Sequence, residues 1–154
     1  MATPTVEIDS LDRAILRKLQ ASGRVSYLEI ARDLAVSGGT IHARVSRMRE
    51  AGLICGVRTV IDYERLGYTV RAFIGLKLVR AHDCGRLIGK LETVPEVLEI
   101  HYTTGAYSLL IKLVAKSMQD LHALLFERLQ GFDEIQSTET FVILDTSLDR
   151  ELPL

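Results

Sequence analysis

The chain lacks the features that mark several large classes of protein. Its 154 residues include two cysteines, Cys55 and Cys84, too few for a disulfide framework. No apolar run approaches the roughly 20 residues that a membrane-spanning helix needs. The first residues, MATPTVEID, contain no apolar core of a signal peptide. These absences predict a cytoplasmic protein with reduced thiols and no membrane partner.

Motifs for catalysis and metal binding are missing as well. The sequence has no nucleophile elbow, no phosphate-binding glycine loop and no paired catalytic carboxylates. Its four histidines are scattered, and although His82 and Cys84 lie two apart, no second cluster completes a zinc site. We therefore expect neither an enzyme nor a resident cofactor or metal.

The net charge of −1 conceals an asymmetry between the two parts of the chain. Residues 1–60 hold nine Lys/Arg and six Asp/Glu, a net charge of +3, whereas residues 61–154 hold ten and fourteen, a net charge of −4. This asymmetry places any contact with DNA in the N-terminal part. Because the excess is modest, we expect one copy to bind DNA weakly and assembly of several copies to strengthen binding.

The stretch 26–52, SYLEIARDLAVSGGTIHARVSRMREAG, predicts two short helices joined by a tight turn. Ser26 and Glu29 have the spacing of a capping box, which starts a helix. Leu28, Ala31 and Leu34 follow at helical spacing, with Ile30 beside them, and are expected to form its apolar stripe. An upstream helix is predicted from the cap Asp9 to Gly23, with an apolar face formed by Leu11, Ile15, Leu16 and Leu19.

The second helix of the pair is expected to begin after Ser37 and to end near Gly52, with Ile41, Val45 and Met48 buried. Helix-turn-helix units place such a helix in the major groove of DNA. Small residues at its start permit close approach of the helix to the DNA. Arg47 and His42 are placed to reach base edges, and Arg44 and Arg49 are placed to reach phosphates. The expected DNA contacts are Ser37, Gly39, Thr40, His42, Ala43, Arg44, Arg47 and Arg49. An ordinary solvated surface is the alternative interpretation of these arginines.

After Gly52 the apolar pattern changes its period. The pattern predicts a short strand or hinge at residues 54–61 and a turn at residues 62–67. Alternation then predicts strands at 68–80, 97–103, 107–115 and 135–144, with helices at 84–93 and from 117 to about 131. The order βαββαβ is that of a ferredoxin-like domain. We thus expect a DNA-binding domain over 1–53, a hinge strand and linker over 54–67, and an α+β domain over 68–154.

Four segments carry a resemblance to a known family: LDRAILRKLQ, VSGGTIHARVSRMREAGLICG, TTGAYSLLIK and DEIQSTETFVIL. With them the chain resembles the leucine-responsive/asparagine-responsive (Lrp/AsnC) family of prokaryotic transcription regulators. GTIHARV, YTTGAYS and DEIQSTET are most similar to its asparagine-responsive branch. The resemblance implies a winged-type helix-turn-helix domain and a ferredoxin-like domain that dimerises and stacks into even-numbered rings, often octamers, that wrap DNA in the nucleoid.

The resemblance also implies an amino-acid effector bound between dimers, near the turn joining the second and third strands. The implied contacts are Thr103, Thr104, Gly105, Ala106, Tyr107 and Ser108, with Gln136, Ser137 and Thr138 from a neighbouring subunit. The chemistry is suitable, because exposed amides at Gly105 can receive a carboxylate and Gln136 can both donate to and accept from an amide. Glu134 or Asp133 is available for the ammonium group. A polar edge strand at an assembly interface is the alternative interpretation of 136–138, whose alternate residues point to opposite faces.

The sequence therefore predicts a sequence-specific DNA-binding regulator whose assembly or DNA affinity responds to an amino acid, with L-asparagine favoured. The alternative is an architectural DNA-binding protein of the same fold that needs no effector.

Overall fold

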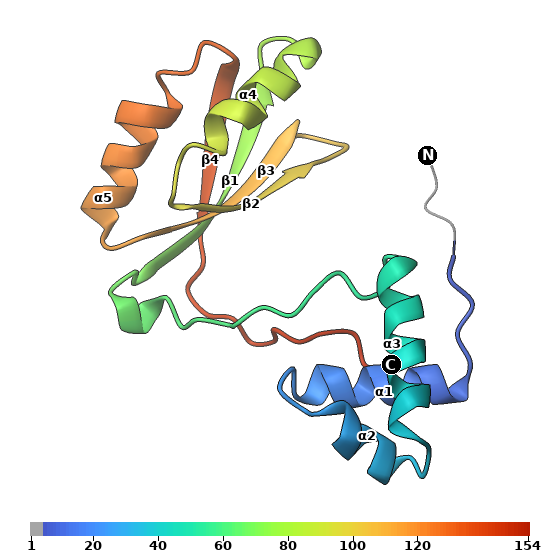
Figure 1. The fold of residues 1–154 in the computed structure, drawn as a ribbon. Helices are drawn as coiled ribbons and strands as arrows, with labels where there is room; N and C mark the ends of the chain where they lie inside the picture. Colours follow the sequence, from blue (N-terminus) through green and yellow to red (C-terminus); the bar gives the residue numbers. More distant parts are fainter. Residues whose placement is uncertain (1–4) are drawn as a thin grey trace. The chain divides into compact units, whose positions relative to one another are not determined.

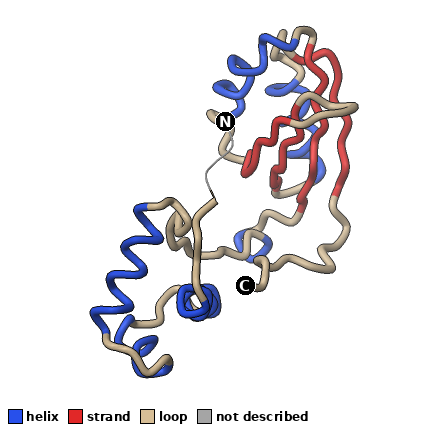
Figure 2. The backbone as a smooth tube through the Cα atoms, turned by 90° about the vertical axis from the view of Figure 1, so that its right-hand side faces the viewer, coloured by secondary structure: helices blue, strands red, loops and turns tan. Residues whose placement is uncertain are grey.

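The computed structural model describes residues 5–154 and divides the chain into two compact units (Figure 1). The N-terminal unit runs to Val60 and also contains Leu148–Leu154. The C-terminal unit spans Ile61–Ser147. Strands occur only in the C-terminal unit among the described residues (Figure 2).

Three helices build the N-terminal unit: α1 (Ser10–Ala21), α2 (Tyr27–Asp33) and α3 (Gly38–Glu50). Each begins where a side chain caps it. Asp9 accepts a hydrogen bond from the backbone of Asp12 and forms a full capping box, while Ser26 and Ser37 cap α2 and α3. The expected helices and cap residues are therefore confirmed, although only Asp9 forms a full capping box. The core they enclose consists of Ile15, Leu16, Ile30, Ala31, Ile41, Val45 and Met48.

One local expectation for α2 needs correction. Leu28 is 67% exposed, whereas Ile30 and Ala31 are buried. At 100° per residue the centre of the buried face lies between these two residues, about 110° from Leu28. The turn to α3 is made by Ala35, whose φ of 52° is left-handed, a conformation that disfavours any side chain with a Cβ.

No wing and no hinge strand follow α3. Residues 53–69 contain only turns, extended backbone and the short 3₁₀ helix η1 (Glu64–Leu66). Isolated extended backbone becomes a strand only when another strand accepts and donates its hydrogen bonds, and this segment has no such partner within the chain described. The single chain described therefore forms no strand over 54–67, and the hinge strand and linker expected there stay a prediction.

The C-terminal unit is a four-stranded antiparallel sheet covered by helices (Figure 1). Its strand order is β2-β3-β1-β4, the arrangement of a ferredoxin-like domain, so the predicted βαββαβ order is confirmed. Its elements are β1 (Val70–Leu78), η2 (Ala81–Asp83), α4 (Cys84–Leu91), β2 (Val97–Tyr102), β3 (Leu109–Ala115), α5 (Met118–Ala123), the π-helix η3 (Leu124–Leu129) and β4 (Ile135–Val142).

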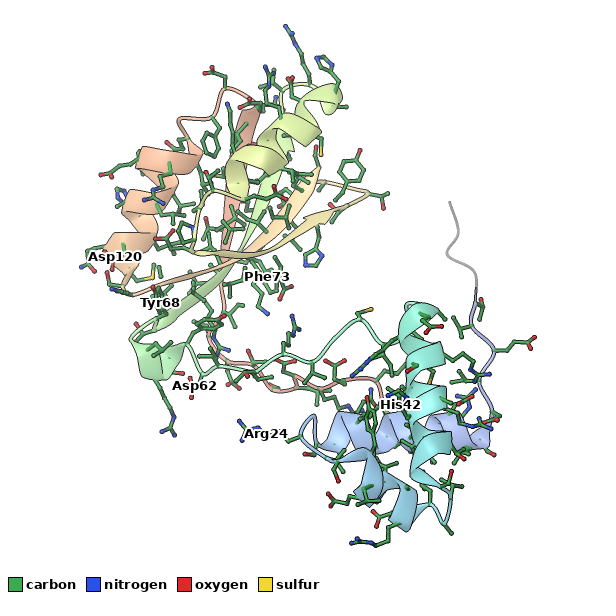
Figure 3. All side chains as sticks on the ribbon, in the orientation of Figure 1. Arg24, His42, Asp62, Tyr68, Phe73 and Asp120 are labelled. Atoms are coloured by element: carbon green, nitrogen blue, oxygen red, sulfur yellow. The ribbon has the colours of Figure 1, made fainter. Side chains whose placement is uncertain are left out.

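The two faces of this sheet differ. Alternate residues of β1, Ala72, Ile74 and Leu76, are fully buried in a core shared with Leu87 and Leu121 of the helices. The other side chains of β1 point to the opposite face, which no helix of the unit covers. They include Phe73, labelled in Figure 3, and Lys77.

The last residues of the chain contact the N-terminal unit. The Arg17 guanidinium donates to the carbonyl oxygen of Leu154, and the Gln20 amide donates to that of Leu152 at 3.3 Å. Leu154 also packs against the apolar core of this unit. The expected domain of 68–154 therefore loses Leu148–Leu154 to the N-terminal unit. None of the described helices is long and apolar enough to cross a membrane.

Candidate functional site

The first half of α3 presents a surface of small and polar residues. Ser37 Oγ accepts a hydrogen bond from the Thr40 backbone at 3.1 Å and lies 2.8 Å from the Thr40 hydroxyl. A Cβ added at Gly39 would meet only Ser37 Oγ, at 3.7 Å, so this surface is open. His42, labelled in Figure 3, is exposed, and its ring meets the edge of Tyr27 with centroids 6.1 Å apart.

Two arginines of α3 are held by carboxylates of α1 and its N-cap. Arg44 Nη1 lies 2.6 Å from Asp9 Oδ2 and 3.0 Å from Asp12 Oδ1, while Arg47 Nη2 lies 2.5 Å from Asp12 Oδ2. Asp12 is completely buried. The Arg44 side chain is 28% exposed and that of Arg47 is 56% exposed, so Arg47 is the more accessible of the two to a binding partner.

The pKa values of the exposed pair follow from this geometry. The Asp12 backbone N–H and then the Arg44 guanidinium hold the pKa of Asp9 below its usual value. The hydrogen bonds to Asp9 and then Asp12 raise the pKa of Arg44. The sequence analysis missed these partners, because the D-x-x-D spacing of residues 9 and 12 signals a helix cap and says nothing about α3.

All eight expected DNA contacts lie on α3 or its cap. Gly39, His42, Ala43 and Arg49 are exposed, and Arg47 remains more than half exposed despite its ion pair. Arg44 points toward α1, so it is the member of the set least available to a phosphate.

The expected effector turn joins β2 to β3 in the C-terminal unit. The backbone N–H of Thr103 donates to the Ser108 carbonyl at 3.1 Å, and the Thr103 hydroxyl donates to the Tyr107 carbonyl at 2.7 Å. Gly105 has a φ of 126°, which a residue with a Cβ rarely adopts. Thr104, Gly105 and Ala106 are exposed at the tip of this closed turn.

Tyr107 anchors the turn on the sheet face that the helices leave free. Its ring lies directly over Gly75 of β1, where an added Cβ would approach Cδ1 to 2.6 Å. Its hydroxyl donates to Glu139 of β4, and this hydrogen bond raises the pKa of Tyr107. The ring also meets the edge of Phe141 with centroids 6.2 Å apart, and Lys77 Nζ lies 6.0 Å from its centroid.

The three expected residues of β4 do not share one face. Ser137 pairs with Lys77 and Thr138 with Leu76, so their side chains point to opposite sides of the sheet. The register shifts between Lys77 and Leu78, and Gln136 is the extra residue at this irregularity. Within one chain, Ser137 lies on the face occupied by Tyr107 and Thr138 on the other.

Glu134 is not available for an effector ammonium group, contrary to expectation. It is buried, and its Oε1 accepts ion pairs from Lys90 Nζ at 2.7 Å and Arg86 Nε at 2.9 Å. The hydrogen bond from Lys90 is the main reason that the pKa of Glu134 is lowered. Asp133 beside it remains exposed.

The described residues hold no metal cluster, and the cavity described on the C-terminal unit lies away from the expected effector residues. Residues 5–154 contain no group of three His, Cys, Asp or Glu that could hold a metal ion. A surface cavity of about 340 Å³ lies against α5 and η3, lined by residues that include Tyr68 and Asp120, both labelled in Figure 3. None of the nine expected effector residues lines it.

Two family models match the two parts of this architecture. Residues 8–49 match the AsnC-type helix-turn-helix domain, and residues 71–153 match the Lrp/AsnC ligand binding domain. The chain belongs to the Lrp/AsnC family. It is similar to "Regulatory protein AsnC" of Haemophilus influenzae, with 45% identity over 94% of this chain and 97% of that protein. The AsnC protein of Escherichia coli K12 is 44% identical over 94% of this chain and 95% of its own length.

Two solved structures agree with these matches. The structure of E. coli AsnC has a TM-score of 0.91 at 42% identity, covering 97% of this chain and all of that one. A transcriptional regulator from Neisseria meningitidis, solved as its L-Met complex, has the same fold, with a TM-score of 0.88 at 21% identity over 94% of each chain. The relatives are named as regulators, and the chain is a transcription regulator with a DNA-binding helix-turn-helix domain and a ligand-binding domain.

Proposed function

We propose that this regulator contacts DNA through the exposed side of α3 and that an amino acid, L-asparagine before others, alters its assembly or its affinity for DNA. The proposal of DNA contact is supported mainly by the exposed surface of α3, where Arg47 and Arg49 flank small residues on a capped helix. An α-helix fits the major groove, and small residues allow its backbone to approach the bases. The contacts we propose are the eight residues named from the sequence, with Arg44 the weakest member because two carboxylates hold it.

The effector half rests on similarity and on the chemistry of the β2–β3 turn. The Neisseria regulator with the same fold binds L-Met in its structure, and the relatives at 44–45% identity are AsnC regulators. The exposed tip at Gly105 offers backbone amides to a carboxylate, and Gln136 offers a donor and an acceptor to a side-chain amide. The proposed contacts are the six residues 103–108 of one subunit and residues 136–138 of another.

Assembly would bring those two sets together. The free face of the sheet carries Phe73, Tyr107 and Phe141 in the C-terminal unit, and Phe141 is 44% exposed. Exposed aromatic side chains on an uncovered sheet face, here beside the charged Lys77 and Glu139, are typical of a surface that pairs with another copy. We propose a homodimer that assembles into a larger even-numbered oligomer, an octamer by resemblance, acting on the nucleoid in the cytoplasm. Residues 1–53 would bind DNA, 54–67 link, and the remainder sense and assemble.

A ligand panel tests the effector half. Purified protein without DNA is heated with each standard amino acid in turn. A ligand at about 100 times its dissociation constant adds roughly 2.7 kcal/mol of stability. We expect a selective rise in melting temperature with L-asparagine, reduced by Gln136→Ala. Gln130→Ala, an exposed glutamine outside the proposed site, is the matched control and should respond as the parent does.

A salt titration of DNA binding tests the other half. Each lost phosphate contact reduces the salt dependence of log K by about one. We expect Arg49→Ala to reduce the slope in this way, whereas Arg65→Ala, an exposed arginine of the C-terminal unit, should keep the parent slope. Equal slopes for all three proteins would remove Arg49 from the DNA surface.

A second candidate is a regulator of the same fold that needs no effector. The observation that favours it is that a single chain places Ser137 and Thr138 on opposite faces of the sheet, so one subunit alone does not gather the expected contacts on one side. A flat ligand panel with intact DNA binding would support this candidate.

A further inference from the structure

The carboxylate of Asp12 is the buried link between α1 and the DNA-facing helix. It is 0% exposed, yet both of its oxygens are engaged: Oδ1 by Arg44 Nη1 at 3.0 Å and Oδ2 by Arg47 Nη2 at 2.5 Å. Oδ2 also accepts from the backbone N–H of Asp9 at 3.2 Å, which completes the capping box. One side chain of α1 therefore contacts two successive arginines of α3.

This arrangement restricts what the arginines can do when DNA approaches. A buried carboxylate that loses its cationic partners is strongly unfavourable, because neither water nor another charge replaces them. Phosphates on DNA would therefore have to bind Arg44 and Arg47 without removing them from Asp12. The two arginines contact DNA only through the N–H groups that Asp12 leaves free.

The free groups differ between the two arginines. Arg44 uses Nη1 for both Asp9 and Asp12, and its side chain is only 28% exposed. Arg47 is bound to Asp12 through Nη2 alone, and its side chain is 56% exposed. Its Nε and Nη1 have no hydrogen-bond partner in the part of the chain that the structure describes.

We infer that Asp12 is a positioning residue for DNA recognition: it fixes the guanidinium plane of Arg47 on the exposed side of α3 and so contributes to sequence discrimination, while Arg44 serves mainly to neutralise the same carboxylate. This inference rests on the proposed DNA-binding function of α3. Arginine recognises guanine through two N–H groups in one plane, so the orientation of that plane before binding decides the contact. An arginine side chain that is already held in place also loses less conformational entropy on binding than a freely rotating one.

The test compares discrimination between DNA sequences in matched variants. A preferred duplex is selected from a random pool with the parent protein, and its affinity is compared with that of a scrambled duplex of equal composition. We expect Asp12→Asn to reduce this affinity ratio by roughly 5- to 150-fold, the range for one good bidentate contact. Binding to the scrambled duplex should be retained, because the substitution removes a negative charge from the DNA-binding unit.

Asp9→Asn is the matched control. It makes the same change of charge, asparagine still caps a helix, and the contact of Asp12 with Arg47 is untouched. Its ratio should equal that of the parent. Arg47→Lys keeps the charge but loses the planar fork, so it should reduce the ratio as Asp12→Asn does, and the double variant should lose no more than either.

An Asp12→Asn protein that folds and keeps the parent ratio would overturn the inference, as would an equal loss in Asp9→Asn. A parent protein that selects no duplex would instead refute the proposed DNA-binding function itself. Should Asp12→Asn fail to fold, ¹⁵N-arginine NMR of the DNA-free parent decides, with Arg47→Lys used to assign the signal. Slow rotation of the Arg47 guanidinium supports the inference, and free rotation overturns it.

Discussion

The packing of Tyr107 on Gly75 can be tested by adding a single methyl group. In the Gly75→Ala variant the new Cβ would lie 2.6 Å from Cδ1 and 2.7 Å from Cγ of the Tyr107 ring. Carbon atoms pack at about 3.5 Å or more, so the ring must move by about 1 Å. The displacement pulls the Tyr107 hydroxyl away from Glu139 and loosens the turn that ends at Ser108.

The magnitude follows from two opposing terms. Overpacking of this kind costs about 1–3 kcal/mol, and replacing a strand glycine by alanine returns roughly 0.5–1 kcal/mol by restricting the unfolded chain. In the parent background the first term dominates, and Gly75→Ala lowers the stability of the C-terminal unit. In a Tyr107→Ala background the clash is absent, so the same substitution should stabilise the unit. The sign of the effect therefore reverses between the two backgrounds.

The assay is thermal unfolding of the four proteins, followed by circular dichroism. For a domain of this size 1 kcal/mol corresponds to about 4–8 °C in melting temperature, so the reversal is readily measured. ¹³C-tyrosine NMR supplies a second readout, because release from Glu139 should return the raised pKa of Tyr107 toward its ordinary value of 10.0. An equal change in melting temperature in both backgrounds would refute the packing argument.

Three further predictions concern separate features. Ala35→Gly should raise the melting temperature of the N-terminal unit, by up to the equivalent of about 1 kcal/mol, because it relieves the left-handed φ of 52°, whereas Ala35→Val should lower it. Ile41→Ala should cost 2–5 kcal/mol in urea unfolding, as other fully buried isoleucines do; a loss below about 1 kcal/mol would contradict the burial of Ile41. The hydrogen bond from Lys90 and the neighbouring cations lower the pKa of Glu134, so its ionised form contributes to the stability of the C-terminal unit. This contribution should be complete above the unfolded pKa near 4.5 and should be lost as the pH falls through the lower folded pKa. Acid titration of Glu134→Gln should show a smaller loss over the same range, and an identical titration would contradict this assignment.

Periodicity predicted most of the fold because each element buries one face. Alternation correctly predicted the strand within 68–80, whose Ala72, Ile74 and Leu76 are buried, and Ser37 correctly marked the start of α3. Leu28 was misplaced because a helix of seven residues is short enough for two overlapping apolar stripes, and only the packing partner decides between them.

The candidate sites were harder to predict because their determinants lie far apart in the sequence. Asp12 and Arg47 are separated by 35 positions, and no local pattern relates a carboxylate of one helix to an arginine of another. Glu134 was read as a free acid because its partners Arg86 and Lys90 belong to a helix more than 40 residues earlier. The pairing of β4 across β1 likewise depends on a register shift that strand alternation alone does not reveal.

The attachment of the last seven residues to the N-terminal unit has a mechanical consequence. The chain leaves this unit after Val60 and returns to it at Leu148, so two covalent segments, not one, join it to the C-terminal unit. One covalent connection leaves two bodies free to rotate against each other, and a second connection restricts that rotation. β4 ends at Val142, and residues 143–147 join it to the returning segment. The backbone after β4 is therefore a second covalent connection to the N-terminal unit, separate from the linker that follows α3.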